Sequence, residues 1–161
     1  MEMEIENTSM HLLLKGFYDS SDSNFKDFWF LQLKHLREIQ IEPEIPHLQQ
    51  IWKRLQFKSC YENAINFLDH YKDSLYCEGY ILTKGIIPIR HAWNKYKNTY
   101  YDITARKFFS EYMTDKYFLI LEVSRENAWK IIAKNKMKGE LLEGYYNHFI
   151  RNKDDFLHLL S

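Results

Sequence analysis

Apolar residues in the first part of the chain recur at the spacing of helices. The run 19–23 is rich in helix-capping residues, and after it the apolar side chains follow one helical stripe over 24–39. Pro46 suits the first turn of a second helix. The apolar face of that second helix consists of Leu48, Ile51, Trp52 and Leu55. The stretch before Gly16 is weakly patterned, so we place the first helix at 24–39.

A third helix is expected to begin at Cys60. Ser59, followed three residues later by Glu62, matches a capping-box pattern. This pattern places Ser59 at the N-cap and Cys60 at the first helical position. The expected inward face of this helix consists of Ala64, Phe67, Leu68 and Tyr71.

The middle of the chain is rich in β-branched and aromatic residues. Three strands are expected over 75–83, 86–96 and 99–104, with a tight turn at Lys97-Asn98. This order predicts a three-stranded antiparallel meander. Pro88 indicates an edge position or a bulge near the start of the second strand.

The rest of the chain returns to helical patterning around one further strand. Helices are expected over 105–113, 124–137, 140–149 and 154–160, and a strand over 115–123. The order of helices, a small antiparallel sheet and helices again is typical of an α+β fold. A length of 161 residues with 45% hydrophobic content favours a single domain over 1–161.

Charge and cysteine content narrow the classes of function. Basic and acidic residues both number 22, so no overall field draws the chain to nucleic acid. No apolar run approaches the roughly 20 residues of a membrane span, and the start of the chain, 1–6, is acidic, unlike a secretory signal. With 2 cysteines, a disulfide-rich scaffold is not expected. We therefore expect a cytoplasmic protein with free thiols and without nucleic-acid or membrane partners.

Cys60 is the first candidate for chemistry. A thiol at a helix start lies near unpaired N–H groups and the positive end of the helix dipole, which favour the thiolate. The backbone N–H of Cys60 could also donate to an oxyanion. Gln56 is a candidate second donor, and the alternative interpretation is an exposed glutamine on the helix surface.

His91 and Asp102 are expected to lie on one face of a hairpin. Side chains alternate between faces along a strand, and paired residues in an antiparallel hairpin have a constant index sum. A two-residue Lys97-Asn98 loop pairs Tyr96 with Thr99, which puts His91 one diagonal step from Asp102. A four-residue loop makes the two residues directly opposite. In either register the carboxylate can orient the imidazole, so the chain carries a thiol, an imidazole and a carboxylate in the order of an acyl-transfer triad.

Several neighbouring residues allow two interpretations. Cys77 is expected to be a buried strand thiol and not the nucleophile. Glu78 is either a substrate contact or a solvated strand residue, and Gly79 indicates a bulge or a close backbone approach. Tyr61, Tyr80 and Trp93 either line an acyl site or pack in the core. No metal or cofactor is expected, because the 2 Cys and 7 His show no paired ligand spacing and no phosphate-binding loop occurs.

At these residues the chain resembles the transglutaminase-like branch of papain-like Cys-His-Asp proteins. It is most similar to small bacterial and phage-type proteins of poorly defined function that carry Cys-Tyr-x-Asn-Ala, Glu-Gly-Tyr, His-Ala-Trp and Asp-Pro-Thr segments. The corresponding segments here are 60–64, 78–80, 91–93 and 102–104, and Ile103 stands where the motif has proline. The resemblance covers about 58–123.

The resemblance implies a papain-like core over about 45–123, in which the sheet packs on the Cys-bearing helix. It implies a Cys60, His91 and Asp102 triad acting on a protein or peptide substrate, as a peptidase, a deamidase or a transglutaminase. The candidate substrate contacts are Tyr61, Asn63, Glu78, Tyr80 and Trp93. The alternative is an inactive scaffold that acts as a protein-binding module, because such superfamilies include inactive members.

Overall fold

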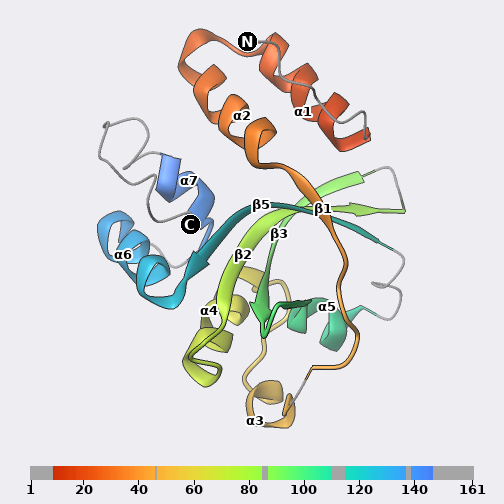
Figure 1. Ribbon diagram of the computed structural model, residues 1–161, viewed down its shortest axis with the longest axis vertical. Coiled ribbons are helices and arrows are strands. Elements are labelled where there is room, and N and C mark those ends of the chain that lie inside the picture. The colour runs from red at the N-terminus through yellow and green to blue at the C-terminus, as the bar shows by residue number, and fades with distance from the viewer. Residues whose placement is uncertain (1–8, 46, 85–86, 110–114, 137–138, 147–161) are drawn as a thin grey trace.

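The protein is an α+β structure built around a curled, five-stranded antiparallel sheet (Figure 1). The computed structural model describes residues 9–45, 47–84, 87–109, 115–136 and 139–146. Among the helices in these ranges, none is long and apolar enough to cross a membrane.

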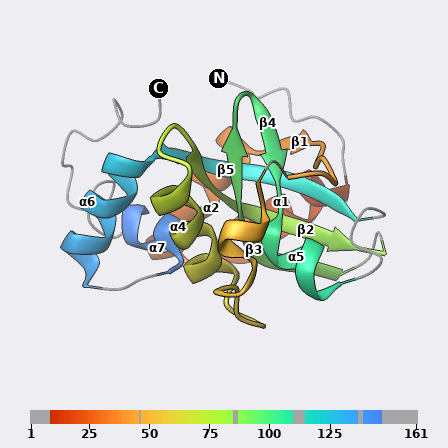
Figure 2. The same cartoon turned by 90° about the horizontal axis from the view of Figure 1, so that it is seen from below.

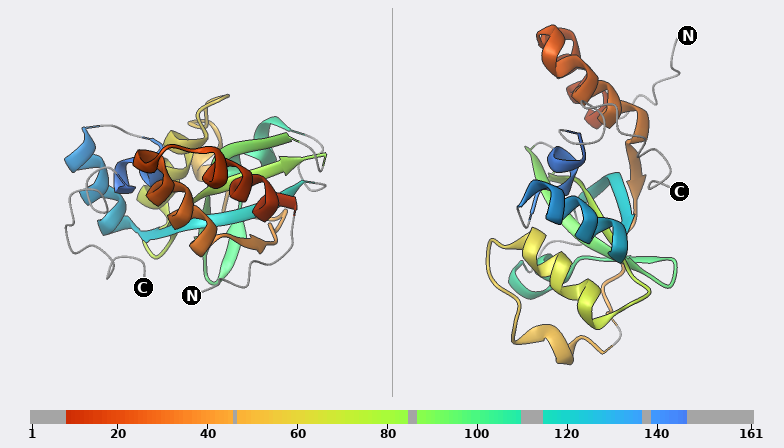
Figure 3. Two further views of the ribbon diagram at one scale, coloured as in Figure 1. Left: turned by 90° about the horizontal axis from the view of Figure 1, so that it is seen from above. Right: turned by 90° about the vertical axis from the view of Figure 1, so that its left-hand side faces the viewer.

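Two helices form the N-terminal part of the described chain. Figure 3 shows α1 (Ser9–Ser20) and α2 (Ser23–His35) side by side, at the opposite end of the molecule from α3 and α4. The placement of the first helix at 24–39 was wrong, because α1 precedes it. Met10 and Leu14 of α1 are buried one turn apart, but Leu12 and Phe17 are exposed. Apolar residues therefore occur on more than one face of this helix, so its sequence lacks a clear amphipathic pattern.

The sheet confirms the predicted meander and extends it. Its strands are β1 (Arg37–Ile39), β2 (Leu75–Thr83), β3 (Ile87–Tyr96), β4 (Thr99–Tyr101) and β5 (Lys116–Ser124), in the order β1-β5-β2-β3-β4. Tyr96 pairs with Thr99, which is the register of the two-residue loop. The helix predicted to reach residue 39 ends at His35, because Arg37–Ile39 pairs with β5 instead.

The remaining helices frame the sheet. They are α3 (Gln49–Trp52), α4 (Cys60–His70), α5 (Ile103–Phe108), α6 (Arg125–Asn135) and α7 (Leu141–Tyr145). The start of α4 at Cys60 is confirmed, although the Ser59 side chain makes no capping hydrogen bond. Ser124 caps α6 as predicted, since its hydroxyl accepts the Asn127 N–H at 3.2 Å. The helix predicted over 154–160 lies outside the described residues.

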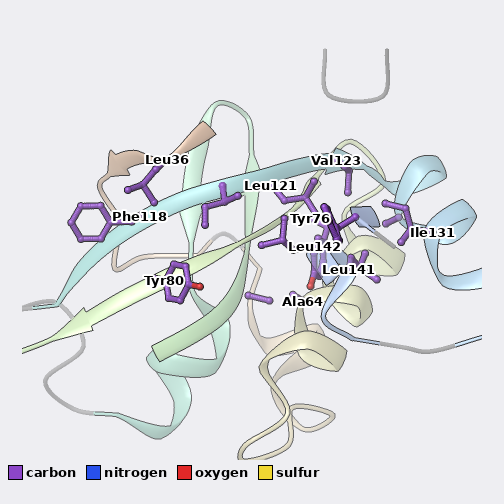
Figure 4. Packing of buried hydrophobic residues seen from close by; sticks show 14 of the residues in the cluster. Leu36, Ala64, Tyr76, Tyr80, Phe118, Leu121, Val123, Ile131, Leu141 and Leu142 are labelled. Carbon is purple, nitrogen blue, oxygen red and sulfur yellow. The ribbon is translucent and has the colours of Figure 1, made fainter. Parts of the chain in front are cut away.

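The sheet separates two apolar layers. Figure 4 shows the larger layer, in which residues of β2 and β5 meet α4, α6 and α7. The other face of the sheet buries a second cluster around Trp93, Cys77 and Tyr117. A bridge between Ile41 and Tyr100 links the segment after β1 to β4. Since β1 and β4 are the edge strands, the two edges of the curled sheet approach each other.

Gly79 allows β2 and β5 to approach closely. The register between these strands shifts at Glu78/Gly79, and a Cβ at Gly79 would collide with the carbonyl oxygen of Phe118. Both expectations for Gly79, a bulge and a close backbone approach, are therefore confirmed.

Candidate functional site

His91 and Asp102 form a buried pair at the centre of the site. His91 Nε2 lies 2.8 Å from Asp102 Oδ2, and the two residues are 7% and 1% exposed. Because a carboxylate oxygen only accepts, the hydrogen of this bond belongs to Nε2 of the imidazole. The pair follows from the Tyr96–Thr99 register, which brings position 102 beside the face of β3 that carries His91.

Asp102 is fixed by two further hydrogen bonds. Its Oδ1 accepts the Ala105 N–H at 2.9 Å, and its Oδ2 accepts the Tyr117 hydroxyl at 2.9 Å. The strand predicted over 99–104 was therefore too long, because Asp102 is the N-cap of α5 and the pairing of β4 stops at Tyr101. The carboxylate that faces His91 thus also begins a helix, which restricts its rotation.

Cys60 opens α4, which packs against β3 (Figure 2). Cys60 is half-buried, whereas His91 and Asp102 are buried. The first turn of α4 is tied to the start of α5, because Asn63 Nδ2 donates to Thr104 Oγ1 at 3.0 Å. The helix of the thiol and the helix capped by Asp102 therefore meet beside His91.

The charges of the site act on the imidazole of His91. Burial by itself lowers the pKa of His91, but the charge and the hydrogen bond of Asp102 act in the opposite direction. The neighbouring Cys60 side chain also raises it, and together these groups bring the pKa of His91 to about 10. Since Nε2 is bonded to Asp102, Nδ1 is the nitrogen left for Cys60.

Gln56 lies in the loop between α3 and α4 and has an exposed side chain. Its backbone is held on both sides by Asn63. The Gln56 N–H donates to Asn63 Oδ1 at 3.0 Å, and Asn63 Nδ2 donates to the Gln56 carbonyl at 2.8 Å. The second helix was expected to include Leu55, but α3 ends at Trp52, so Gln56 lies outside a helix.

Cys77 is a buried strand thiol, as predicted. It is 0% exposed, and burial, assisted by the charge of Glu122, raises its pKa well above the ordinary value. Cys60 and Cys77 are both free thiols. Of the two, Cys60 is the accessible one.

Glu78 is fully buried, so the interpretation as a solvated strand residue was wrong. Its carboxylate accepts the Tyr76 hydroxyl at 2.8 Å and the Leu142 N–H at 3.1 Å, and Arg90 Nη2 donates to it at 3.3 Å. Burial raises the pKa of Glu78, while Arg90 acts against this shift. Glu78 thus anchors the start of α7 to the sheet.

Tyr61 is the half-buried member of the candidate substrate contacts. Burial, followed by the charge of Glu78, raises the pKa of its hydroxyl far above the ordinary value, so it stays protonated. A Cβ added to Gly139 would lie 3.4 Å from Tyr61 Cβ, which places the segment before α7 against this tyrosine.

The other candidate substrate contacts are buried. Trp93 is 0% exposed, and its ring lies 6.4 Å from the His91 ring and 5.5 Å from the Tyr117 ring. The Tyr80 hydroxyl donates to Gln32 Oε1 of α2 at 2.9 Å, and Asn63 is 0% exposed. Trp93 and Asn63 therefore support the site from within, and Tyr80 joins the sheet to α2.

The sequence did not reveal the roles of Tyr117, which contacts Asp102, and of Arg90, which contacts Glu78. Tyr117 reaches Asp102 because β5 pairs with β2, and the hydrophobic pattern of β5 does not reveal its neighbour in the sheet. Arg90 is bound to a buried carboxylate. Because side chains alternate along a strand, Arg90 lies on the opposite face of β3 from its neighbour His91. This alternation was the one signal in the sequence for the position of Arg90.

Within the described ranges, no group of three or more His, Cys, Asp or Glu side chains is arranged to hold a metal ion. Comparisons of the chain with protein-family models, with curated proteins and with solved structures find no match. The functional proposal therefore depends on the chemistry of the site itself.

Proposed function

We propose that this protein is a cysteine-dependent acyl-transfer enzyme with a papain-like triad of Cys60, His91 and Asp102. One observation carries the proposal: Asp102 Oδ2 binds His91 Nε2 at 2.8 Å inside the protein and leaves the other imidazole nitrogen for Cys60. In this role Asp102 fixes the orientation and tautomer of the imidazole.

Acylation begins with Cys60 giving its proton to His91. The high pKa of His91 favours this transfer, and Asp102 stabilises the resulting imidazolium. The sulfur then attacks the carbonyl carbon of an amide, and the negative charge of the tetrahedral intermediate develops on the carbonyl oxygen. The backbone N–H of Cys60 and the side chain of Gln56 are the proposed donors to this oxygen.

Collapse of the intermediate breaks the carbon–nitrogen bond, and His91 returns its proton to the leaving amine. The acyl group is then held as a thioester on Cys60. Attack by water, with His91 taking the proton, releases a carboxylic acid and completes an amide hydrolysis, as in a peptidase or a deamidase. Attack by a primary amine instead forms a new amide, as in a transglutaminase.

A protein or peptide is the proposed substrate, because the acyl-transfer reactions of this triad act on amides. The half-buried position of Cys60 is compatible with an extended chain presenting its amide at the surface. Tyr61, adjacent to the thiol and half-buried, is the proposed direct contact.

Alkylation by iodoacetamide tests this function against the alternative of an inactive binding module. At pH 6 an ordinary thiol is almost fully protonated, so a poised Cys60 should react roughly tenfold or more faster than glutathione. His91→Ala should remove most of this advantage. Cys77 serves as the internal control, because it is buried and should stay unlabelled in the folded protein.

The labelled peptide is identified by mass spectrometry, and Cys60→Ser gives the background. Labelling of Cys60 at the rate of glutathione, unaffected by His91→Ala, would contradict the enzymatic proposal and favour the binding module.

A further inference from the structure

We propose that Asn63 is a positioning residue that holds the loop of Gln56 against the first turn of the helix that begins at Cys60, so that the Gln56 side chain can donate to the oxyanion. The proposal rests on the proposed function, since it concerns the donors of the same acyl-transfer site.

Asn63 uses its whole side-chain amide to join three segments. Its Oδ1 accepts the Gln56 N–H at 3.0 Å, while its Nδ2 donates to the Gln56 carbonyl at 2.8 Å and to Thr104 Oγ1 at 3.0 Å. The residue is 0% exposed, so water does not compete for these bonds. Asn63 also lies one helical turn after Cys60, on the same face of α4.

The two bonds to Gln56 fix the backbone of that residue as a neighbouring strand would. Both the N–H and the carbonyl are bound, so the direction of the Gln56 side chain is restricted at its base. The backbone N–H of Gln56 is already donated to Asn63 and is therefore not free to bind an oxyanion. The exposed side-chain amide is the donor that remains available at this residue.

The third bond relates this loop to the other half of the triad. Thr104 follows Asp102 by two residues at the start of α5, and its hydroxyl accepts from Asn63. One buried amide thus sets the loop of Gln56 and the helix start of Cys60 against the helix that Asp102 caps. Two of the three side-chain bonds of Asn63 go to Gln56, and none of the three goes to Cys60 or His91. Changes at Asn63 should therefore affect the oxyanion donor more than the reactivity of the thiol.

Two reactions of Cys60 separate these effects. Acylation by p-nitrophenyl acetate forms a carbon–sulfur bond through a tetrahedral oxyanion, and the carbon–oxygen bond then breaks to release p-nitrophenolate. Alkylation by iodoacetamide displaces iodide in one step and forms no oxyanion. The ratio of the acylation rate to the alkylation rate therefore reports the oxyanion donors, while changes in thiolate content cancel to first order.

Asn63→Asp keeps the acceptor for the Gln56 N–H but removes both donated bonds, and Asn63→Ser is an uncharged second variant. Each should lower the ratio at least about tenfold, and Gln56→Ala should lower it by a similar factor. Combining Asn63→Asp with Gln56→Ala should lower the ratio little further, because both changes act through one donor. Thr104→Val keeps both bonds to Gln56 and is the matched control, for which the ratio should stay within about twofold of wild type.

Folding of each variant is checked by circular dichroism and by its unfolding midpoint in urea. An unchanged ratio in a folded Asn63 variant would overturn this inference but not the proposed function. The same holds if Asn63→Asp lowers the ratio equally in the wild-type and Gln56→Ala backgrounds. Gln56 is exposed, so Gln56→Ala should keep the fold, and an unchanged ratio in that variant would overturn it as well. If wild-type Cys60 is acylated no faster than in His91→Ala, both the inference and the proposed function fail.

Discussion

The stability of a Cys60→Ala variant should decrease as the pH rises above neutrality. In this variant the imidazole of His91 titrates beside Asp102, and the thiol of Cys60 is absent. Asp102 raises the pKa of His91 above the ordinary value of 6.5. A raised histidine pKa stabilises the folded state fully below pH 6.5, and this stabilisation is lost as the pH rises through the folded-state pKa.

The size of the effect follows from proton linkage. Between the two pKa values the folded state holds one more proton than the unfolded state, which changes the free energy of unfolding by about 1.4 kcal/mol per pH unit. With a folded pKa of about 10, the loss between pH 7 and pH 8.5 is about 2 kcal/mol. This is the upper limit for the variant, since Cys60 contributes to the pKa of His91 in the wild-type protein.

The wild-type protein should show a weaker dependence over the same range. If Cys60 has given its proton to His91, the folded pair holds one proton, which is the number held by these two residues in the unfolded chain near pH 7.5. The wild-type slope therefore distinguishes a thiolate–imidazolium pair from a protonated imidazole beside a neutral thiol.

Urea unfolding followed by tryptophan fluorescence, at pH 7.0, 7.5, 8.0 and 8.5, measures these slopes. The matched control is the Cys60→Ala, His91→Gln double variant, which lacks the titrating imidazole. Its free energy of unfolding should show only the pH dependence of the remaining groups, which is subtracted from that of Cys60→Ala. Equal slopes in Cys60→Ala and the double variant would refute the reasoning, because His91 would then bind no extra proton in the folded state.

Two further substitutions test the packing around the site by urea unfolding. Gly79→Ala should lower the free energy of unfolding by about 3 kcal/mol or more, because its Cβ would collide with the Phe118 backbone, whereas Gly16→Ala meets no atom within 4 Å and should raise it by about 0.5–1 kcal/mol. Similar effects at the two glycines would contradict the close approach of β2 and β5. Glu78→Ala should cost about 3–5 kcal/mol by leaving buried donors unpaired, and the exposed Asp69→Ala should cost less than about 1 kcal/mol. A loss at Glu78 no larger than that at Asp69 would show that its buried contacts are weak.

The parts of the fold that the sequence predicted depend on local signals. The start of α4 at Cys60 and the Tyr96–Thr99 register each follow from residues within a few positions of one another. The register also predicted the approach of His91 to Asp102. In each case the short sequence separation leaves few competing arrangements.

The parts that escaped prediction depend on contacts far apart in the chain. β1 is a strand because Arg37 pairs opposite Leu119 of β5, and nothing within its own three residues distinguishes it from the end of α2. Tyr117 reaches Asp102 for the same reason. The burial of Glu78 depends on α7 returning to cover it, so its strand position alone left two interpretations open.

Ile103 occupies the first position of α5, directly after Asp102. Proline at the first position of a helix would fix the backbone after Asp102. Here the Asp102 carboxylate accepts the Ala105 N–H, and Ile103, 1% exposed, packs in an apolar cluster with Phe67 of α4. Burying such a side chain contributes about 1.5–3 kcal/mol. Ile103 therefore provides a buried contact between α5, the helix that Asp102 caps, and α4, the helix that begins at Cys60.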